Sequence, residues 1–163
     1  MIDVTQLSDE RLNALILNAE RLRCTFEEIY RDAIEERNRR HGGGLDLKTS
    51  VRAIFQAARA KRYLSYGELA AANGADWNAV RYPMNTHLGE IIRYAKYRRW
   101  PMLSAIVVNK QNLEHGVMEP STLKGFIEAA KWLGHDVNSA EEFLKQQQED
   151  CFAWGRTLSE ADL

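Results

Sequence analysis

The pattern of apolar and polar positions predicts helices over most of the chain. In the first forty residues, apolar side chains recur three or four positions apart, which predicts helix from Ser8 to Arg40. Ser8 is a residue type that caps helix starts. Thr25 followed by Glu28 has capping-box spacing, so a break is expected near Cys24. The apolar stripe of this helical pair consists of Leu12, Leu15, Ile16, Leu22, Ile29, Tyr30 and Ile34.

Three consecutive glycines, at 42–44, divide the chain. Glycine commonly ends helices and forms flexible joints. We therefore expect a helical extension at 5–41, a second domain at 45–155 and a mobile tail at 156–163. A phosphate-binding loop is a poor interpretation of these glycines, because no Lys-Ser or Lys-Thr follows and no strand precedes them.

Two helices are predicted at the start of the second domain. Residues 49–62 have an apolar stripe at helical spacing. Ser65 and Glu68 are spaced as a capping box, which predicts a short helix at 66–72. Asn73 and Gly74 then favour a turn.

A long helix and a strand are predicted next. Pro83 prevents a continuous helix through that point, and Pro101 ends the helix predicted at 85–99. The β-branched run at 102–110 predicts one buried strand. Two further helices are predicted at 122–133 and from Ala140 to about Trp154. The expected fold is mainly α, of the α+β class: a helical pair, then a winged-helix-like domain with a small sheet.

Charge is distributed unevenly along the chain. Residues 47–110 contain eleven Lys and Arg but three Asp and Glu, a net charge of +8, whereas residues 1–46 carry −3 and residues 111–163 carry −6. A local field of this size attracts polyanions, and nucleic acid is the first candidate. The alternative is that the basic middle is neutralised by its own acidic flanks.

The order of helix, short helix, turn, long helix and strand is that of a helix-turn-helix unit with a wing. The long second helix of such a unit lies in the DNA major groove. Its cations, and those near it, are expected to contact phosphates and position double-stranded DNA. These cations are Lys48, Arg52, Arg81, Arg93, Lys96, Arg98, Arg99 and Lys110.

The sequence indicates no metal or cofactor and no membrane span. Cys24 and Cys151 match no metal-ligand spacing, and we expect them to be free thiols of a cytoplasmic protein. None of the four histidines pairs with a Cys or Glu at metal-ligand spacing. No apolar run approaches the length of a transmembrane helix, and the first residues lack a signal-peptide pattern.

The segment Leu64-Ser65-Tyr66-Gly67-Glu68-Leu69-Ala70 resembles the first helix-turn-helix segment of the O6-alkylguanine-DNA alkyltransferases and alkyltransferase-like proteins. In that family a Tyr-x-x-Leu-Ala stretch follows a short strand. A recognition helix, a Pro-Cys-His-Arg-Val active-site segment and another strand come next. The resemblance covers residues 49–134 and implies that Tyr66 presses on a DNA phosphate beside a flipped nucleotide. From the residues alone, Tyr66 is equally well interpreted as an aromatic side chain that packs on the core.

This sequence departs from the family pattern at the positions that alkyl transfer requires. Met102 stands at the place of the alkyl-acceptor cysteine, and Leu103 stands at that of the activating histidine. A thioether cannot become a thiolate, so covalent alkyl transfer is not expected. The family's intercalating arginine has no counterpart directly before Leu88 and Gly89, where the nearest preceding arginine is Arg81. Base flipping is therefore not carried over from the resemblance.

A second resemblance is to small bacterial and phage proteins that look like accessories of mobile or antiviral-defence loci. It rests on a Leu-Gly-x-Ile helix at 88–91 and on Pro-x-Leu-Ser-Ala-x-Val-Val-Asn-Lys at 101–110. The leading hypothesis is a non-catalytic DNA-binding protein of bacterial or phage origin. One alternative is a protein-interaction module of a defence or mobile-element system, assembled as a homodimer through the N-terminal helices.

A small metal-dependent nuclease is the other alternative. Such nucleases need clustered carboxylates, often with a lysine, and Glu90 with Lys110, or Glu114 with Glu119, would supply a poor version of this arrangement. Their spacing matches no diagnostic pattern.

Overall fold

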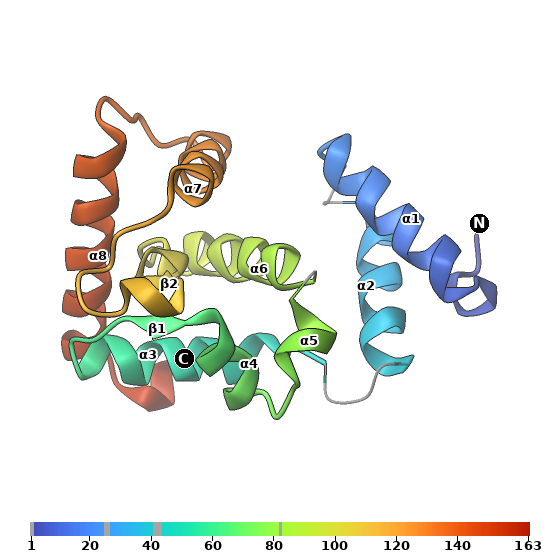
Figure 1. Cartoon of the computed structure of the whole chain (residues 1–163), viewed down its shortest axis with the longest axis horizontal. Helices are drawn as coiled ribbons and strands as arrows, with labels where there is room; N and C mark the ends of the chain where they lie inside the picture. The colour runs from blue at the N-terminus through green and yellow to red at the C-terminus, as the bar shows by residue number, and fades with distance from the viewer. Residues whose placement is uncertain (1, 25–26, 41–43, 82) are drawn as a thin grey trace. The chain divides into compact units, whose positions relative to one another are not determined.

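The computed structural model describes residues 2–24, 27–40, 44–81 and 83–163. The chain forms two compact units, Met1–Gly44 and Leu45–Leu163 (Figure 1). The helix start predicted at Thr25 lies outside the described residues, and so do the first two glycines of the predicted joint.

The first unit is a pair of helices, α1 (Asp9–Arg21) and α2 (Glu28–Arg40), preceded by the 3-10 turn η1 (Val4–Gln6). The hydroxyl of Ser8 accepts a hydrogen bond from the backbone N–H of Arg11 at 3.3 Å, so the predicted cap is confirmed. Six buried side chains form a core within this unit: Val4, Leu12, Ile16, Tyr30, Ala33 and Ile34.

This core bears on the predicted homodimer. Leu15 and Ile29 of the predicted stripe are partly buried against it, while Leu22 is exposed. Most of the stripe is therefore covered by the two helices themselves. The homodimer stays a prediction. Because the two helices cover most of the stripe, the stripe does not require a second copy of the chain to cover it.

Arg40 connects the end of α2 to the start of the unit. Its guanidinium donates to the Leu7 carbonyl at 2.7 Å, to the Asp9 carboxylate at 3.0 Å and to Glu36 at 2.7 Å. Hydrogen bonds from Arg39 and Arg40 lower the pKa of Glu36 to about 2. The buried Glu36 carboxylate is thus held charged between two guanidinium groups, which is the usual condition for burying such a group.

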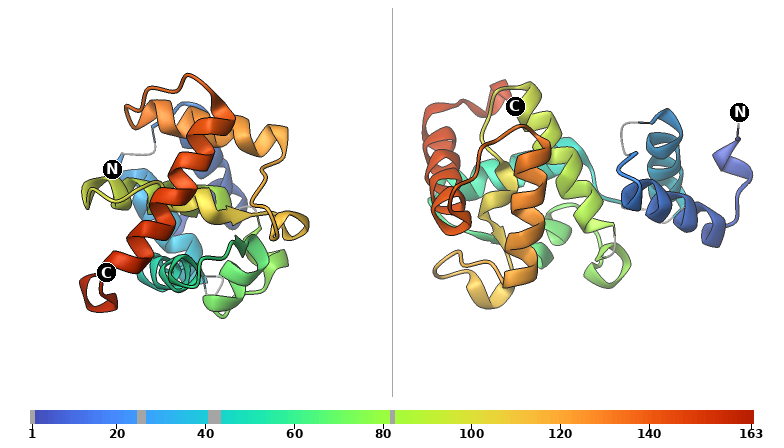
Figure 2. Two further views of the ribbon diagram at one scale, coloured as in Figure 1. Left: turned by 90° about the vertical axis from the view of Figure 1, so that its left-hand side faces the viewer. Right: turned by 90° about the horizontal axis from the view of Figure 1, so that it is seen from above.

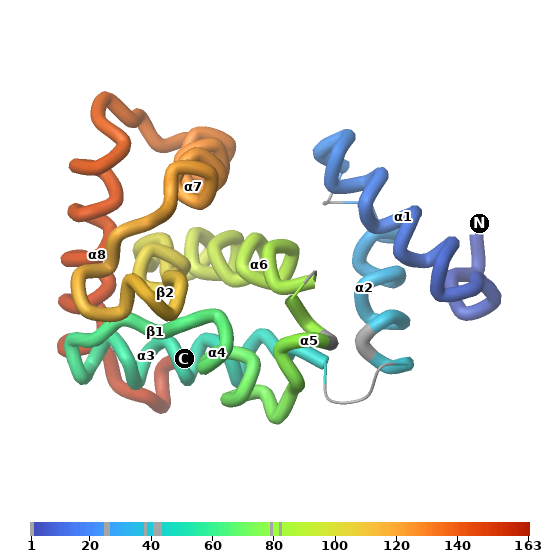
Figure 3. The backbone as a smooth tube through the Cα atoms, viewed as in Figure 1, coloured from blue at the N-terminus to red at the C-terminus, as the bar shows by residue number. Residues whose placement is uncertain are grey.

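The second unit is mainly helical with a small sheet, which confirms the expected fold class. Its helices are α3 (Leu47–Arg59), α4 (Tyr66–Ala72), α5 (Trp77–Val80), α6 (Met84–Tyr97), α7 (Pro120–Trp132) and α8 (Ala140–Thr157). Its 3-10 turns are η2 (Leu103–Ile106), η3 (Lys110–Asn112) and η4 (Glu160–Asp162). Strands β1 (Leu64–Ser65) and β2 (Val107–Val108) pair in parallel, with Leu64 opposite Val107 (Figure 3).

The short helix α4 has its predicted bounds. The Ser65 hydroxyl accepts from the Glu68 N–H at 3.1 Å, and the Glu68 carboxylate accepts from the Ser65 N–H at 2.8 Å. Both halves of the predicted capping box are therefore formed. This cap fixes where the chain turns from β1 into α4, and hence where Tyr66 lies.

Helix α8 crosses and packs on α3 in the second unit (Figure 2, left). Phe55 of α3 and Trp100 both pack on Trp154 of α8, with ring centroids 5.3 and 5.2 Å apart. Gly155 lets the two backbones approach, since an added Cβ would lie 2.6 Å from the Arg59 nitrogen.

The prediction of a strand at 102–110 is wrong for most of these residues. Residues Leu103–Ile106 form a 3-10 turn, and only Val107 and Val108 are in a strand. The run is apolar because Met102 through Val108 is almost entirely buried, and a continuous apolar run does not distinguish a strand from other buried backbone.

The wing of the predicted winged helix stays a prediction. Helices α3, α4 and α6, followed by β2, have the expected order, and the short helix α5 occupies the expected turn. Residues 109–119, where a wing would follow β2, contain η3 and no strand.

The segment predicted as a mobile tail is attached to the second unit. Residues 156 and 157 continue α8, so the boundary predicted at 155 is two residues early. Leu158 and Leu163 pack on the core, and Arg98 donates to the Asp162 carbonyl at 2.5 Å. Its mobility stays a prediction.

Candidate nucleic-acid interface

A cleft of about 620 Å³ lies in the second unit and is lined by residues of five segments. The start of α4 and the start of α5 contribute Tyr66 and Trp77, and the residue after α5 contributes Arg81. The N-terminal half of α6 lines it from Met84 to Ile92. Residues 104–129, from η2 to α7, supply the rest. The lining thus combines residues that are more than sixty positions apart in the sequence.

Two aromatic rings form one wall of the cleft. Tyr66 and Trp77 stack with their ring centroids 6.2 Å apart and their planes 19° apart. Burial raises the pKa of Tyr66, so its phenol stays protonated and can donate a hydrogen bond. Trp77 remains about one-third exposed. A stacked pair of this kind offers a flat surface for a planar ligand.

The polar lining has one cation and no carboxylate. Among the described residues that line the cleft, Arg81 is the single Lys or Arg, and none is Asp or Glu. The other polar side chains are amides and hydroxyls: Asn85, Asn109, Ser104, Ser121 and Thr122. Such groups donate and accept hydrogen bonds without adding negative charge. Exposed Lys110 and Lys124 adjoin two lining residues, Asn109 and Gly125.

Two of the nine residues predicted to contact DNA, Tyr66 and Arg81, line the cleft, and a third, Lys110, follows the lining residue Asn109 in the sequence. Tyr66 lines the cleft, stacks on Trp77 and is packed against the core, which agrees with the core-packing interpretation, while its contact with a phosphate stays a prediction. Lys48 and Arg52 are exposed on α3, which does not line the cleft. Arg52 lies 3.4 Å from the Glu160 carboxylate.

The predicted cations near the end of α6 make contacts within the protein. The Arg93 guanidinium lies 5.6 Å from the Trp132 ring centre, and the Lys96 ammonium donates to the Leu133 carbonyl. Arg98 lies 4.5 Å from the centre of Trp100 and donates to the Tyr94 hydroxyl at 2.8 Å. Arg99 is exposed just beyond the helix with a φ of 59°. The nine predicted residues therefore do not form one continuous patch.

The residue of the active-site-like segment that reaches the cleft is Ser104. Met102 and Leu103, which stand at the places of the acceptor and its activator when the pattern is aligned on Pro101, are buried in the core and do not line the cleft. No cysteine lies in the segment 101–110.

A buried polar network supports the N-terminal half of α6. The Ser50 hydroxyl of α3 lies 2.6 Å from His87 Nε2, and the Asn73 amide donates to the same hydroxyl at 2.9 Å. The Asn73 carbonyl oxygen accepts from the Asp46 N–H at 2.8 Å. Burial lowers the pKa of His87 to about 4, and the Asp46 carboxylate opposes this only in part. His87 is therefore neutral near pH 7.

The acidic residues of the nuclease hypothesis do not cluster with metal-ligating side chains. Glu119 accepts from Asn112 at 3.1 Å, and Glu114 lies beside His115 at the surface. Within the described ranges, no group of three or more His, Cys, Asp or Glu side chains is placed to hold a metal ion. None of the described helices has the length and apolarity needed to cross a bilayer.

No model of a known family, no curated protein and no solved structure matches the chain. The function is therefore inferred from the residues and the geometry of the cleft.

Proposed function

We propose that this chain is a non-catalytic DNA-binding protein that acts in the cytoplasm of a bacterium or phage-infected cell. In this proposal the second unit contacts double-stranded DNA with the surface around the cleft. The observation that carries the proposal is the polar lining of the cleft, which has Arg81 and no carboxylate beside the Tyr66–Trp77 pair.

The charge of the surrounding chain favours a polyanion. Residues 47–110, which supply Tyr66 through Asn109 of the lining, have a net charge of +8. Lys110 and Lys124 are exposed and are adjacent in the sequence to the lining residues Asn109 and Gly125. Phosphate contacts from such cations supply most of the affinity in protein–DNA binding, while amide and hydroxyl groups fix the register.

The helix order supports DNA in particular. Helices α4 and α6 stand in the order of a helix-turn-helix unit, and α6 is the helix that would approach the duplex. Its N-terminal half lines the cleft. The resemblance of residues 64–70 to a DNA-binding family also favours a phosphate near Tyr66. The DNA surface proposed here is thus at the start of α6, rather than at its basic C-terminal end.

A protein-interaction role is the second candidate. Three large apolar side chains of the first unit, Ile2, Leu17 and Leu22, are between 57% and 64% exposed. Exposed apolar groups of this kind are found where proteins bind other proteins. In this alternative the basic surface of the second unit meets an acidic protein.

A binding titration tests the proposal. A labelled blunt duplex, a single strand and an RNA of equal length are each titrated with protein over a range of salt concentrations. We expect duplex binding whose logarithmic affinity falls linearly with the logarithm of salt. Arg81→Ala and Trp77→Ala should each weaken it, with the fold intact by circular dichroism. Failure to bind the duplex even at low salt would contradict the proposal, and Mg²⁺-dependent cleavage of the duplex would favour the nuclease.

A further inference from the structure

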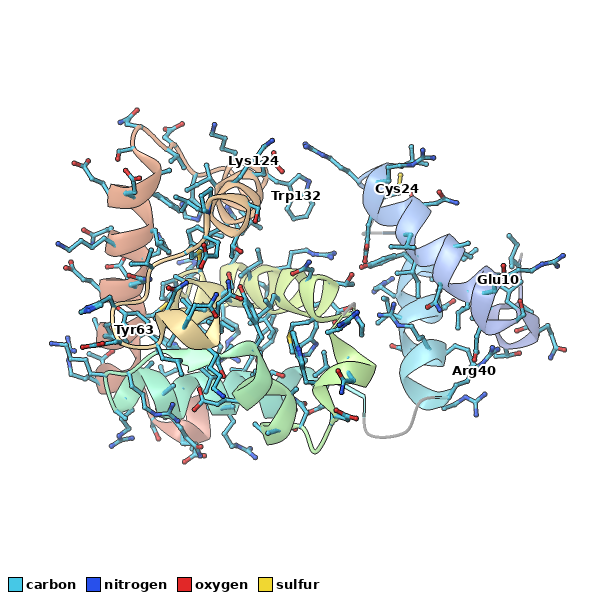
Figure 4. The ribbon with its side chains drawn as sticks, in the orientation of Figure 1. Glu10, Cys24, Arg40, Tyr63, Lys124 and Trp132 are labelled. Atoms are coloured by element: carbon cyan, nitrogen blue, oxygen red, sulfur yellow. The ribbon has the colours of Figure 1, made fainter. Side chains whose placement is uncertain are left out.

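Two exposed aromatic side chains and one cation lie beyond the cleft. Tyr97 of α6 is 85% exposed and Trp132 of α7 is 46% exposed. The Arg93 guanidinium lies 5.6 Å from the centre of the Trp132 ring. Trp132 projects from α7 on the side opposite α8 (Figure 4). We call these three residues the aromatic ridge. It shares no residue with the lining of the cleft.

The ridge continues the cleft along the same two helices. Gly89 lines the cleft, Arg93 follows one helical turn later and Tyr97 one turn after that, a distance of about 12 Å along α6. On α7, Ala129 lines the cleft and Trp132 is three residues further on. The hydrogen bond from Lys96 to the Leu133 carbonyl connects the two helices at this level. A chain leaving the cleft in this direction would meet the ridge next.

The charge around the ridge suits a polyanion. Residues 89–99 and 124–134 together contain six Lys and Arg but two Glu. Lys131 and Arg99 are exposed there. A cation beside an exposed aromatic ring is the combination that binds nucleic acid through phosphate and base together.

The exposed rings favour unpaired bases over a duplex. In a duplex, the faces of the bases are covered by their neighbours, so an aromatic side chain on the protein surface cannot stack on them. In a single strand the faces are accessible, and every base has one. Tyr97 projects into solvent with most of its surface uncovered, so its ring is available to a base.

We propose that the aromatic ridge binds an unpaired DNA strand that runs on from the cleft. Bases stack on Tyr97 and Trp132, and Arg93 with its neighbouring cations contacts the phosphates. This inference rests on the proposed function, because it assumes that the surface around the cleft already holds DNA.

Substitutions that remove or keep the rings test the ridge. The probes are an oligothymidylate and a blunt duplex of mixed sequence. Tyr97→Ala and Trp132→Ala should each weaken oligothymidylate binding by about tenfold, which corresponds to the loss of one stacked base. Tyr97→Phe and Trp132→Phe keep a ring and should stay within about twofold of the parent. All four variants should bind the blunt duplex within about twofold of the parent, because the ridge does not contact it.

The outcomes separate the two proposals. Salt-dependent binding of the duplex without binding of oligothymidylate would overturn the ridge and leave the proposed function in place. Equal losses for both probes in the alanine variants would also overturn it, because the ridge would then not select unpaired bases. If the parent protein binds neither probe, the proposed function fails first. Unchanged melting temperatures exclude misfolding as the cause of any loss, since both side chains are exposed.

Discussion

At the scale of single residues, His87 and Ser50 join α6 to α3 by a contact of 2.6 Å. The Asn73 amide donates to the Ser50 hydroxyl, and the direction of the hydrogen bond between Ser50 and His87 is set by the tautomer of the ring. Burial keeps the ring neutral at pH 7, by lowering the pKa of His87 from 6.5 to about 4. The start of α6, and with it one side of the cleft, therefore depends on an uncharged histidine.

The first prediction concerns acid stability. Between pH 6.5 and pH 4 the unfolded state binds a proton at His87 and the folded state does not. The free energy of unfolding should therefore fall as the pH drops through this window, by about 3 kcal/mol from this residue alone. Urea denaturation of the parent and of His87→Gln at pH 7 and pH 4.5 measures it. The variant should be less stable at pH 7 and should lose less on acidification; equal losses in both proteins would contradict the role of His87.

The second prediction concerns alkyl transfer. Burial raises the pKa of Cys151, which keeps it a thiol, and Ser104 is the residue of the active-site-like segment that lines the cleft. A thiol of this kind is a poor nucleophile. DNA carrying radiolabelled O6-methylguanine should therefore leave the protein unlabelled. Label recovered on Cys24 or Cys151 by peptide mapping would contradict this.

At the scale of elements, the packing of α8 on α3 depends on Gly155. A Cβ at this position would lie 2.6 Å from the Arg59 nitrogen and 2.7 Å from the Ala58 carbonyl carbon. Both are backbone atoms, so the helices must move apart to admit it. Gly125 of α7 is a suitable comparison, because a Cβ there would meet nothing within 4 Å.

The third prediction follows from this contrast. Gly155→Ala should destabilise the protein by about 1–3 kcal/mol, the usual cost of overpacking a core. Gly125→Ala should be neutral or stabilising by up to about 1 kcal/mol, because alanine favours helix over glycine. Denaturant unfolding of both variants measures the difference. If Gly155→Ala is as stable as Gly125→Ala, the close approach of α3 and α8 is not present in solution.

An element could be predicted from the sequence when the interactions that form it are between residues close together in the chain. Helix α4 was predicted with its bounds because Ser65 and Glu68 form a cap within four residues. The strand at 102–110 was overpredicted because its apolar residues are buried on all sides, so they carry no period. Helix α5 was missed because four residues give no periodic pattern, although Asp76 caps it with a hydrogen bond to the Asn78 N–H.

At the scale of the whole molecule, the charge pattern predicts a basic segment of the sequence but not where its cations lie on the surface. Helical periodicity distributes the cations of one segment over several surfaces, so Arg52 lies beside the Glu160 carboxylate and Arg98 donates to the Asp162 backbone carbonyl. The pair of Arg52 and Glu160 is a contact of the kind that the neutralisation alternative expects, and that alternative stays a prediction. The cleft could not be predicted, because residues as distant as Tyr66 and Ala129 line it together.

The fourth prediction concerns the two units. The core of the second unit contains only residues from Leu45 onward, and that of the first only residues up to Ile34. A fragment of residues 45–163 should therefore fold alone, with a cooperative thermal transition. Its circular dichroism spectrum should be that of a mainly helical protein. A fragment without a cooperative transition would show that the first unit is needed for the fold.

The central claim is that DNA binds to the surface around the cleft. The salt dependence of DNA binding by two double variants, each lacking two cations, tests this claim most directly. Arg81→Ala with Lys110→Ala removes the cation that lines the cleft and the one that follows the lining residue Asn109, and Lys48→Ala with Arg52→Ala removes two from α3. Removing one cation that contacts a phosphate lowers the slope of log affinity against log salt by about one. We predict that the first pair lowers the slope for a blunt duplex by about two and that the second leaves it at the parental value. Equal slopes for the two variants, or a reduced slope confined to the α3 pair, would contradict the assignment of the DNA surface to the cleft.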